Sequence, residues 1–116
     1  MMLIEETNVP DAVLPVEAFR MHLRLGSGFG QDGLQDPVLR SFLRAAIAAV
    51  EARTGKVLIT RRFALSLTFW RDAAAQVLPV APVQEVARVA LVARDGAETL
   101  VDPDRYWLER DAQAPR

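Results

Sequence analysis

The residues of this chain that could do chemistry begin with a glycine-rich segment. Gly28–Gly33, read as GFGQDG, fits the pattern G-x-G-x-x-G, in which backbone amides approach the pyrophosphate of a dinucleotide. The pattern works where a strand leads into it and a helix comes after it, so that helix amides meet the phosphates. Here a helical pattern precedes it, and Asp32 and Asp36 place negative charge where phosphates would bind. We therefore expect a connector between two helices.

The other candidate groups are isolated ones. His22 is the only histidine, so a two-histidine metal site is excluded within one chain, and a catalytic triad could form only through it. Asp102 and Asp104 are hard-cation ligand types, but a turn around Pro103 explains both of them. We expect no catalytic residue, no bound metal and no cofactor.

The amino-acid composition limits the classes of function that this chain can have. The chain has 116 residues, is 51% hydrophobic and carries a net charge of −1, from 14 basic and 15 acidic residues. The electrostatic field of a chain with so little net charge attracts neither nucleic acid nor an acidic membrane surface. Cysteine is absent, which excludes disulfides and thiolate metal sites and favours assembly in a reducing compartment. No apolar run approaches the roughly 20 residues that span a bilayer, so we expect a soluble protein.

The first part of the chain predicts an arm and then a helix. Residues 1–15 contain Pro10 and Pro15 and show no sustained period, which indicates an extended N-terminal arm. From residue 16 to residue 25 the apolar side chains share one face of a helix, and the charged ones, Arg20 among them, lie on the other. We expect one α+β domain over residues 16–116, with two to three helices packed on a small antiparallel sheet that includes a hairpin.

The second helix has the clearest signals in the sequence. Asp36 and Pro37 predict its start, since Asp accepts hydrogen bonds from first-turn amides and Pro loses no needed donor there. Thr54 and Gly55 predict its end, because Gly adopts the left-handed conformation that closes a helix. The residues expected to form its buried stripe are spaced three and four apart: Leu39, Phe42, Leu43, Ala46, Ile47 and Val50.

The second half of the chain predicts short strands. Alternation is strongest over residues 59–69, and Asp95-Gly96 indicates a tight hairpin turn between Val86–Ala93 and Glu98–Val101. A last strand is expected at Tyr106–Glu109, and the few residues after it supply no obvious strand to cover its edge. We infer either a missing C-terminal segment or an edge covered by a partner.

Some basic and aromatic residues are candidates for subunit contacts. Arg40 and Arg44 lie one helical turn apart and repel each other unless an acceptor lies opposite. They form either a solvated face or a contact with an acidic partner, and the sequence leaves both open. Tryptophans near strand ends are either packing residues or subunit contacts. The full candidate interface is Arg40, Arg44, Ala48, Glu51, Arg61, Arg62, Trp70 and Trp107.

An ordered series of segments resembles the head-tail connector (adaptor) proteins of long-tailed phages and gene transfer agents. The series spans nearly the whole chain, and the order of elements matches as well as the residues. Its members are LPVEAFRMHLRL at Leu14–Leu25, an acidic glycine-containing loop, LRAAIAAVEARTGKVL at Leu43–Leu58, Trp70 at a strand end, LPVAPVQEVARVALVARDG at Leu78–Gly96 and Tyr106-Trp107-Leu108.

This resemblance implies a role in assembly. Such proteins form a ring, commonly of twelve copies, under the portal in the neck of the virion, and they receive the stopper and tail below. DNA passes through the lumen during ejection, and the near-neutral charge fits that passage because a strongly basic lumen would hold the duplex. The resemblance also implies assembly in the bacterial cytoplasm, no membrane contact, and a further C-terminal segment that helps dock to the portal.

Two other functions stay open at this point. The chain is a stopper or another neck protein of the same particle, which shares the assembly logic but attaches elsewhere. Alternatively it is a small ligand-binding enzyme domain that uses the glycine-rich loop and His22. We expect the first class of function, a structural protein without enzymatic activity.

Overall fold

The computed structural model describes residues 1–24 and 32–116, so most of the predicted glycine-rich connector lies outside the described residues. The chain forms two compact units, Met1–Leu67 and Thr68–Arg116, and each is described by itself. The arm over 1–15 and the domain over 16–116 stay predictions. The arm belongs to the first unit, where Met2–Glu5 form a strand.

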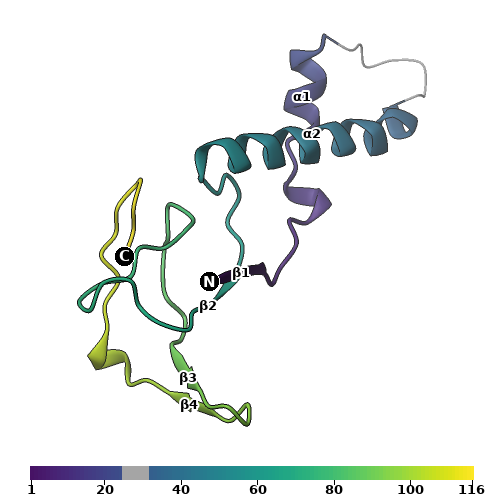
Figure 1. Ribbon diagram of the computed structural model, residues 1–116. Coiled ribbons are helices and arrows are strands. Elements are labelled where there is room, and N and C mark those ends of the chain that lie inside the picture. Colours follow the sequence, from purple (N-terminus) through teal and green to yellow (C-terminus); the bar gives the residue numbers. More distant parts are fainter. Residues whose placement is uncertain (25–31) are drawn as a thin grey trace. The chain divides into compact units, whose positions relative to one another are not determined.

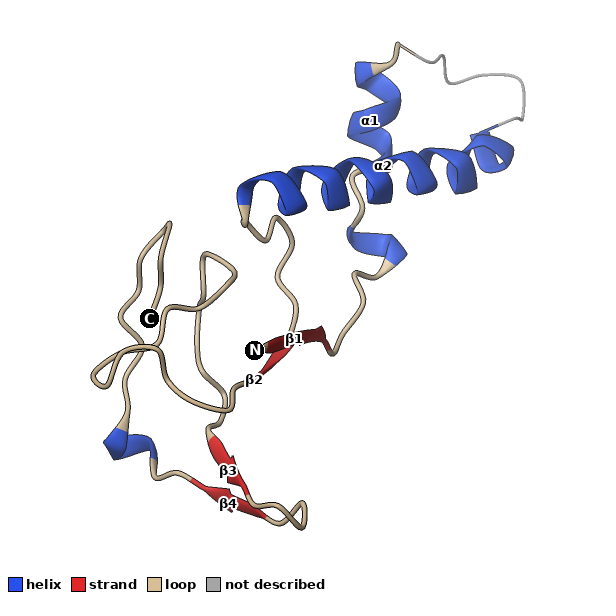
Figure 2. Cartoon of the chain, viewed as in Figure 1, coloured by secondary structure: helices blue, strands red, loops and turns tan. Residues whose placement is uncertain are grey.

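The first unit combines two helices with a two-stranded sheet (Figures 1 and 2). Its helices are α1, Val16–His22, and α2, Asp32–Thr54. Its strands are β1, Met2–Glu5, and β2, Phe63–Ser66, which pair antiparallel with Met2 opposite Ser66. The predicted α+β class is confirmed, and the long strand expected over residues 59–69 is reduced to the four residues of β2.

The predicted start of α2 is wrong. The helix begins at Asp32, and Pro37 lies inside it. Asp36 does not cap the helix, because its carboxylate pairs with the guanidinium of Arg20 on α1. The Asp36 side chain is therefore used in a tertiary ion pair and not in the helix cap that the local sequence predicted.

The predicted end of α2 is confirmed. Gly55 follows the last helical residue with a φ of +68°, and its amide donates to the carbonyl of Glu51 at 2.8 Å. The Thr54 hydroxyl donates to the Val50 carbonyl at 2.8 Å. The chain then leaves the helix through residues 56–62, which contact α2 and the arm before β2 begins.

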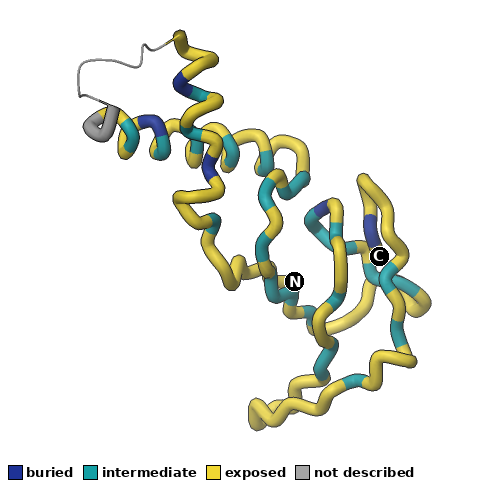
Figure 3. Tube along the Cα trace, turned by 180° about the vertical axis from the view of Figure 1, so that it is seen from behind, coloured by how far each residue is buried: buried dark blue, intermediate teal, exposed yellow. Residues whose placement is uncertain are grey.

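The core of the first unit is small (Figure 3). Leu14 and Leu39 are its buried apolar residues. Of the predicted stripe on α2, Leu39 is buried, and Leu43 and Ile47 are half-buried. The prediction is wrong for the rest, because Phe42, Ala46 and Val50 are exposed. One unit this size does not supply enough covering surface for both sides of a long helix.

The second unit is built around a hairpin. Strands β3, Ala90–Val92, and β4, Glu98–Leu100, pair antiparallel, and they are shorter than the sequence predicted. The predicted turn is confirmed, since Gly96 has a φ of +86° and the Ala97 amide donates to the Asp95 carboxylate at 2.9 Å. A 3-10 turn over Pro103–Arg105 comes next, with the Asp104 amide bonded to the Asp102 carboxylate at 3.0 Å.

The strand predicted at Tyr106–Glu109 is not formed. Instead Glu109 and Arg116 exchange two backbone hydrogen bonds, at 2.7 and 3.1 Å, and their side chains form an ion pair. The carbonyl of the buried Pro115 accepts from the Leu78 amide at 2.8 Å. The backbone of Glu109 is thus partnered by the last residue of the chain, a return that a Pro-containing tail did not suggest.

The end of α2 offers a stability test. Nothing lies within 4 Å of a Cβ built on Gly55, so Gly55→Ala introduces only the strain of a left-handed conformation. We expect a loss of about 1 kcal/mol in the free energy of unfolding, measured by urea denaturation. Gly55→Asn is the matched control and should lose less, because Asn tolerates this conformation. A Gly55→Ala variant as stable as the parent would contradict the helix end described above.

Candidate functional site

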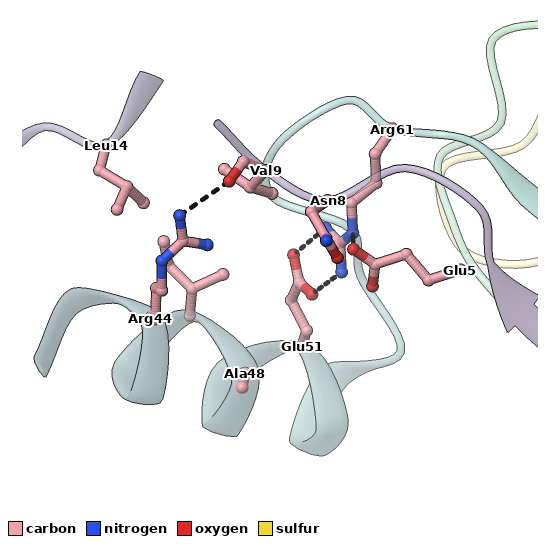
Figure 4. A pocket seen from close by; sticks show the side chains of 9 residues that line it. Glu5, Asn8, Val9, Leu14, Arg44, Ala48, Glu51 and Arg61 are labelled. Carbon is pink, nitrogen blue, oxygen red and sulfur yellow. Dashed lines mark hydrogen bonds and ion pairs between the residues drawn. The ribbon is translucent and has the colours of Figure 1, made fainter. Parts of the chain in front are cut away.

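The predicted interface residues divide between the two units. Six of them belong to the first unit, and the two tryptophans belong to the second. In the first unit the structure shows them mostly holding the arm against α2, in the arrangement drawn in Figure 4.

Glu51 and Arg61 form the central ion pair of this arrangement (Figure 4). Arg61 donates through Nη1 to Glu51 Oε1 at 2.9 Å and through Nη2 to Glu51 Oε2 at 2.5 Å. The Arg61 Nε lies 2.9 Å from a carboxylate oxygen of Glu5, and the Leu58 amide donates to Glu51 Oε1 at 2.8 Å. The pair is largely enclosed, with 10% of the Arg61 side chain and 12% of the Glu51 side chain exposed. The bidentate contact with Glu51 and the contact with Glu5 thereby join α2, the segment after it and β1.

This environment fixes the charge of both partners. Hydrogen bonds from Arg61 and from the Leu58 amide hold the pKa of Glu51 below its ordinary value of 4.5, against the opposing effect of burial. The same contact raises the pKa of Arg61. Because the folded-state pKa of Glu51 is lowered, its contribution to stability is complete above the ordinary value and is lost as the pH falls through the folded-state value.

Arg44 makes a second contact between α2 and the arm. Its Nη2 donates to the Asp11 carboxylate at 2.5 Å and to the Val9 carbonyl at 2.8 Å. The hydrogen bond from Arg44 lowers the pKa of Asp11. Arg40 lies near a carboxylate of its own helix, with Nη2 4.0 Å from Asp36 Oδ2. The sequence left open whether Arg44 is solvated or contacts an acidic partner; its acceptor is present in the same chain.

A small cavity of about 130 Å³ lies between the arm and α2 (Figure 4). Leu14, Ile47 and Ala48 supply apolar lining, and the two ion pairs border it. Ala48 therefore faces the arm of its own chain. A cavity this small, bordered by charges that are already paired, offers no evident binding site for a substrate.

Arg20 is a structural residue that the sequence prediction misplaced. It was assigned to the solvent side of the first helix, yet only 7% of the residue is exposed. Its guanidinium pairs with Asp36 of α2 and lies 3.5 Å from the carboxylate of Glu17. An arginine late in one helix and an aspartate early in the next could have signalled this contact across the connector.

The predicted contact residues of the second unit lie on the surface. Trp107 is 82% exposed and Trp70 is 52% exposed, with Phe69 beside it at 74%. The hairpin strands also expose Leu91, Val92 and Leu100. Exposed aromatic side chains such as these are candidates for contact surfaces, in which aromatic residues are enriched.

The described residues do not form a metal cluster. Over residues 1–24 and 32–116, no three His, Cys, Asp or Glu side chains come together in a way that could hold an ion. Within the same ranges, no helix has both the length and the apolar character needed to cross a membrane.

Comparison with known proteins gives matches among solved structures, while no family model and no curated protein matches the chain. The neck of an empty GTA particle, computed with C6 symmetry, contains a chain of 52% identity and a TM-score of 0.92, covering 99% of this chain and 58% of that one. The virion of a native gene transfer agent (GTA) particle gives 52% identity and 0.88, covering 100% and 59%. This chain is similar to gene transfer agent neck proteins. The predicted family resemblance is confirmed.

A further match to this group gives the same result. The neck of a native GTA particle, computed with C12 symmetry, contains a chain of 46% identity and a TM-score of 0.85, covering 99% of this chain and 56% of that one. The present chain therefore spans somewhat less than three fifths of the length of the gene transfer agent chains that it matches.

The Glu51–Arg61 pair predicts a specific acid sensitivity. Glu51→Gln should lower the free energy of unfolding by about 2 kcal/mol at neutral pH, because it removes a charged acceptor of the enclosed Arg61. The parent should lose stability as the pH falls from about 6 to about 3, and the variant should lose less. Urea denaturation across this range measures both. The control is Glu17→Gln, since the Glu17 side chain is 74% exposed. Equal acid sensitivity in parent and Glu51→Gln would contradict the assignment.

The Arg44 contact predicts how firmly the arm is held. Arg44→Ala should accelerate amide hydrogen exchange in residues 9–14 roughly two- to fivefold, because an exposed ion pair to Asp11 and a bond to Val9 are lost. Arg53→Ala, an exposed arginine of the same helix, should leave that exchange unchanged. Unchanged exchange in both variants would show that Arg44 does not hold the arm.

Proposed function

We propose that this chain is a structural component of the neck of a gene transfer agent or related phage-like particle, acting as a head-tail adaptor. The observation that carries the proposal is the match to the neck of a GTA particle at 52% identity over 99% of the chain. Identity at this level, spread over both units, supports a shared role as well as a shared fold. The role is structural and needs no catalytic step.

The number of copies is inferred from the symmetry of the matched particles. Their necks are computed with C6 and C12 symmetry, which support several equivalent copies of a neck chain around an axis. We propose a ring, most simply of twelve copies, between the portal and the stopper or tail, with DNA passing through its lumen. The net charge of −1 is compatible with a duplex that must slide past without being held.

The surface of the chain supports a role in assembly. Many of the exposed side chains are large and apolar, Trp107 and Phe69 among them. Surface of this kind is stabilised when partners cover it.

The candidate interface residues then take two kinds of role. Arg62, Trp70 and Trp107 are exposed and are proposed to contact partners directly. Arg44, Ala48, Glu51 and Arg61 are proposed to act indirectly, because their contacts within the chain set the position of the arm on α2. Arg40, which lies near Asp36 of its own helix, is proposed to support that helix.

Co-expression with the portal protein of the same particle tests this proposal. Electron microscopy of the purified complex should show a ring of added density beneath the portal, and a variant lacking residues 68–116 serves as the control. A portal without added density, or this chain bound below a separate adaptor, would overturn the adaptor role. The second result would assign a stopper role in the same neck.

Trp107 predicts a separation of stability from assembly. Because it is 82% exposed, Trp107→Ala should leave the melting temperature within about 2 °C of the parent. In the complex this side chain is expected to be buried by a partner. Its loss should weaken binding roughly tenfold or more, measured by titration against the portal complex. Gln113→Ala, another exposed position of the second unit, should change neither. Tight binding by Trp107→Ala would remove this residue from the interface.

A further inference from the structure

The charged residues in the middle of α2 lie on one side of the helix, and that side faces the arm. At 100° per residue, Arg40, Arg44 and Glu51 lie on the side that faces the arm, where each has an acidic or basic neighbour in this chain. The opposite side carries no charged residue between Val38 and Ala52, and Arg53 lies at its end, in the last turn of the helix. We call it the outer face of α2, and all of its members are exposed: Val38, Phe42, Ala45, Ala46, Ala49 and Ala52.

This arrangement reverses the usual one. A helix at a protein surface places charged residues toward water and apolar ones toward the core, whereas a helix that is apolar all round is buried. On the outer face Phe42 is 60% exposed and Val38 is 53% exposed. Within the described residues, nothing in this chain covers them.

Helix propensity alone does not account for the outer face. Alanine is the best helix former, so an exposed alanine-rich helix is stable without a partner. Lys, Glu and Arg form helices nearly as well and keep a surface soluble, yet none of them occurs there between Val38 and Ala52. Phe42 and Val38 add apolar area and have lower helix propensity than alanine. The composition fits a face that is covered in the assembled state.

We propose that the outer face of α2 is covered by a second copy of this chain, the next one around the ring. This inference rests on the proposed neck function. The matched necks have C6 and C12 symmetry, and a cyclic ring requires a contact in which one surface meets a different surface of the next copy. The outer face must therefore meet another apolar surface, and both units of the chain expose large apolar side chains.

The chemistry of the face favours this occupant over nucleic acid. Duplex DNA is bound through several cations that neutralise phosphates, and the outer face has none between Val38 and Ala52, with the single Arg53 at its end. Its small side chains, Ala45, Ala46 and Ala49, let another backbone approach closely, with Phe42 as the larger anchor. The absence of charge also removes any desolvation penalty for a buried unpaired ion.

Site-specific cross-linking in assembled particles tests the occupant. The chain contains no cysteine, so Ala49→Cys creates one unique thiol for a maleimide-benzophenone label. On illumination, mass spectrometry of purified particles should find the Ala49 label joined to a peptide of a second copy, in an adduct of twice the chain mass. Ala48→Cys is the matched control, because Ala48 lines the cavity beneath the arm and should react within its own chain.

The outcomes separate the inference from the function. An Ala49 label joined to a different neck protein, or to its own chain only, overturns the inference while the neck function stands. Absence of the chain from the particles overturns both. Because the label itself could block assembly, the thiol reactivity of the unlabelled Ala49→Cys variant is measured as well. It should react freely in the isolated chain and at least tenfold more slowly in particles. Equal reactivity in the two states also overturns the inference.

Discussion

The contact between Glu51 and Arg61 is the interaction on which the first unit depends. It ties α2 to the segment after it and, through Glu5, to β1, while Arg44 ties the same helix to the arm at Asp11. Few apolar residues are buried in this unit, so paired charges supply connections that a larger core supplies elsewhere. Removing one partner leaves an enclosed charge without compensation, which is why a single carboxylate matters here.

These contacts also explain why α2 presents an apolar surface to water. Arg44 and Glu51 are paired on the inner side, where the arm supplies Asp11 and the segment after the helix supplies Arg61. The outer face is left with alanines, Val38 and Phe42, which is unfavourable for an isolated monomer and favourable for a member of a ring. In the proposed ring this one helix links fold and assembly, because its inner side contacts its own chain and its outer face would contact the next copy.

Local signals in the sequence predicted local structure well. The glycine at the end of α2 and the Asp95-Gly96 turn both result from backbone preferences that need no tertiary context, and both are confirmed. The start of α2, the place of Arg20 and the return of the tail onto Leu78 depend on contacts between distant residues, and these predictions failed. The interface residues were predicted from their types and their positions in the sequence, which could not show that Arg44 and Glu51 already have partners in the chain. Family resemblance carried the functional prediction further than any site did.

The central claim is that this chain becomes complete in a ring, where a neighbouring copy covers the outer face of α2. A cryo-electron microscopy reconstruction of the particle neck, at a resolution that shows side chains, tests it most directly. The account predicts that Phe42 and Ala49 lie against residues of the adjacent copy while Glu51 and Arg61 stay paired within their own chain. A reconstruction in which that face points into solvent, or in which this chain is absent from the neck, would contradict it.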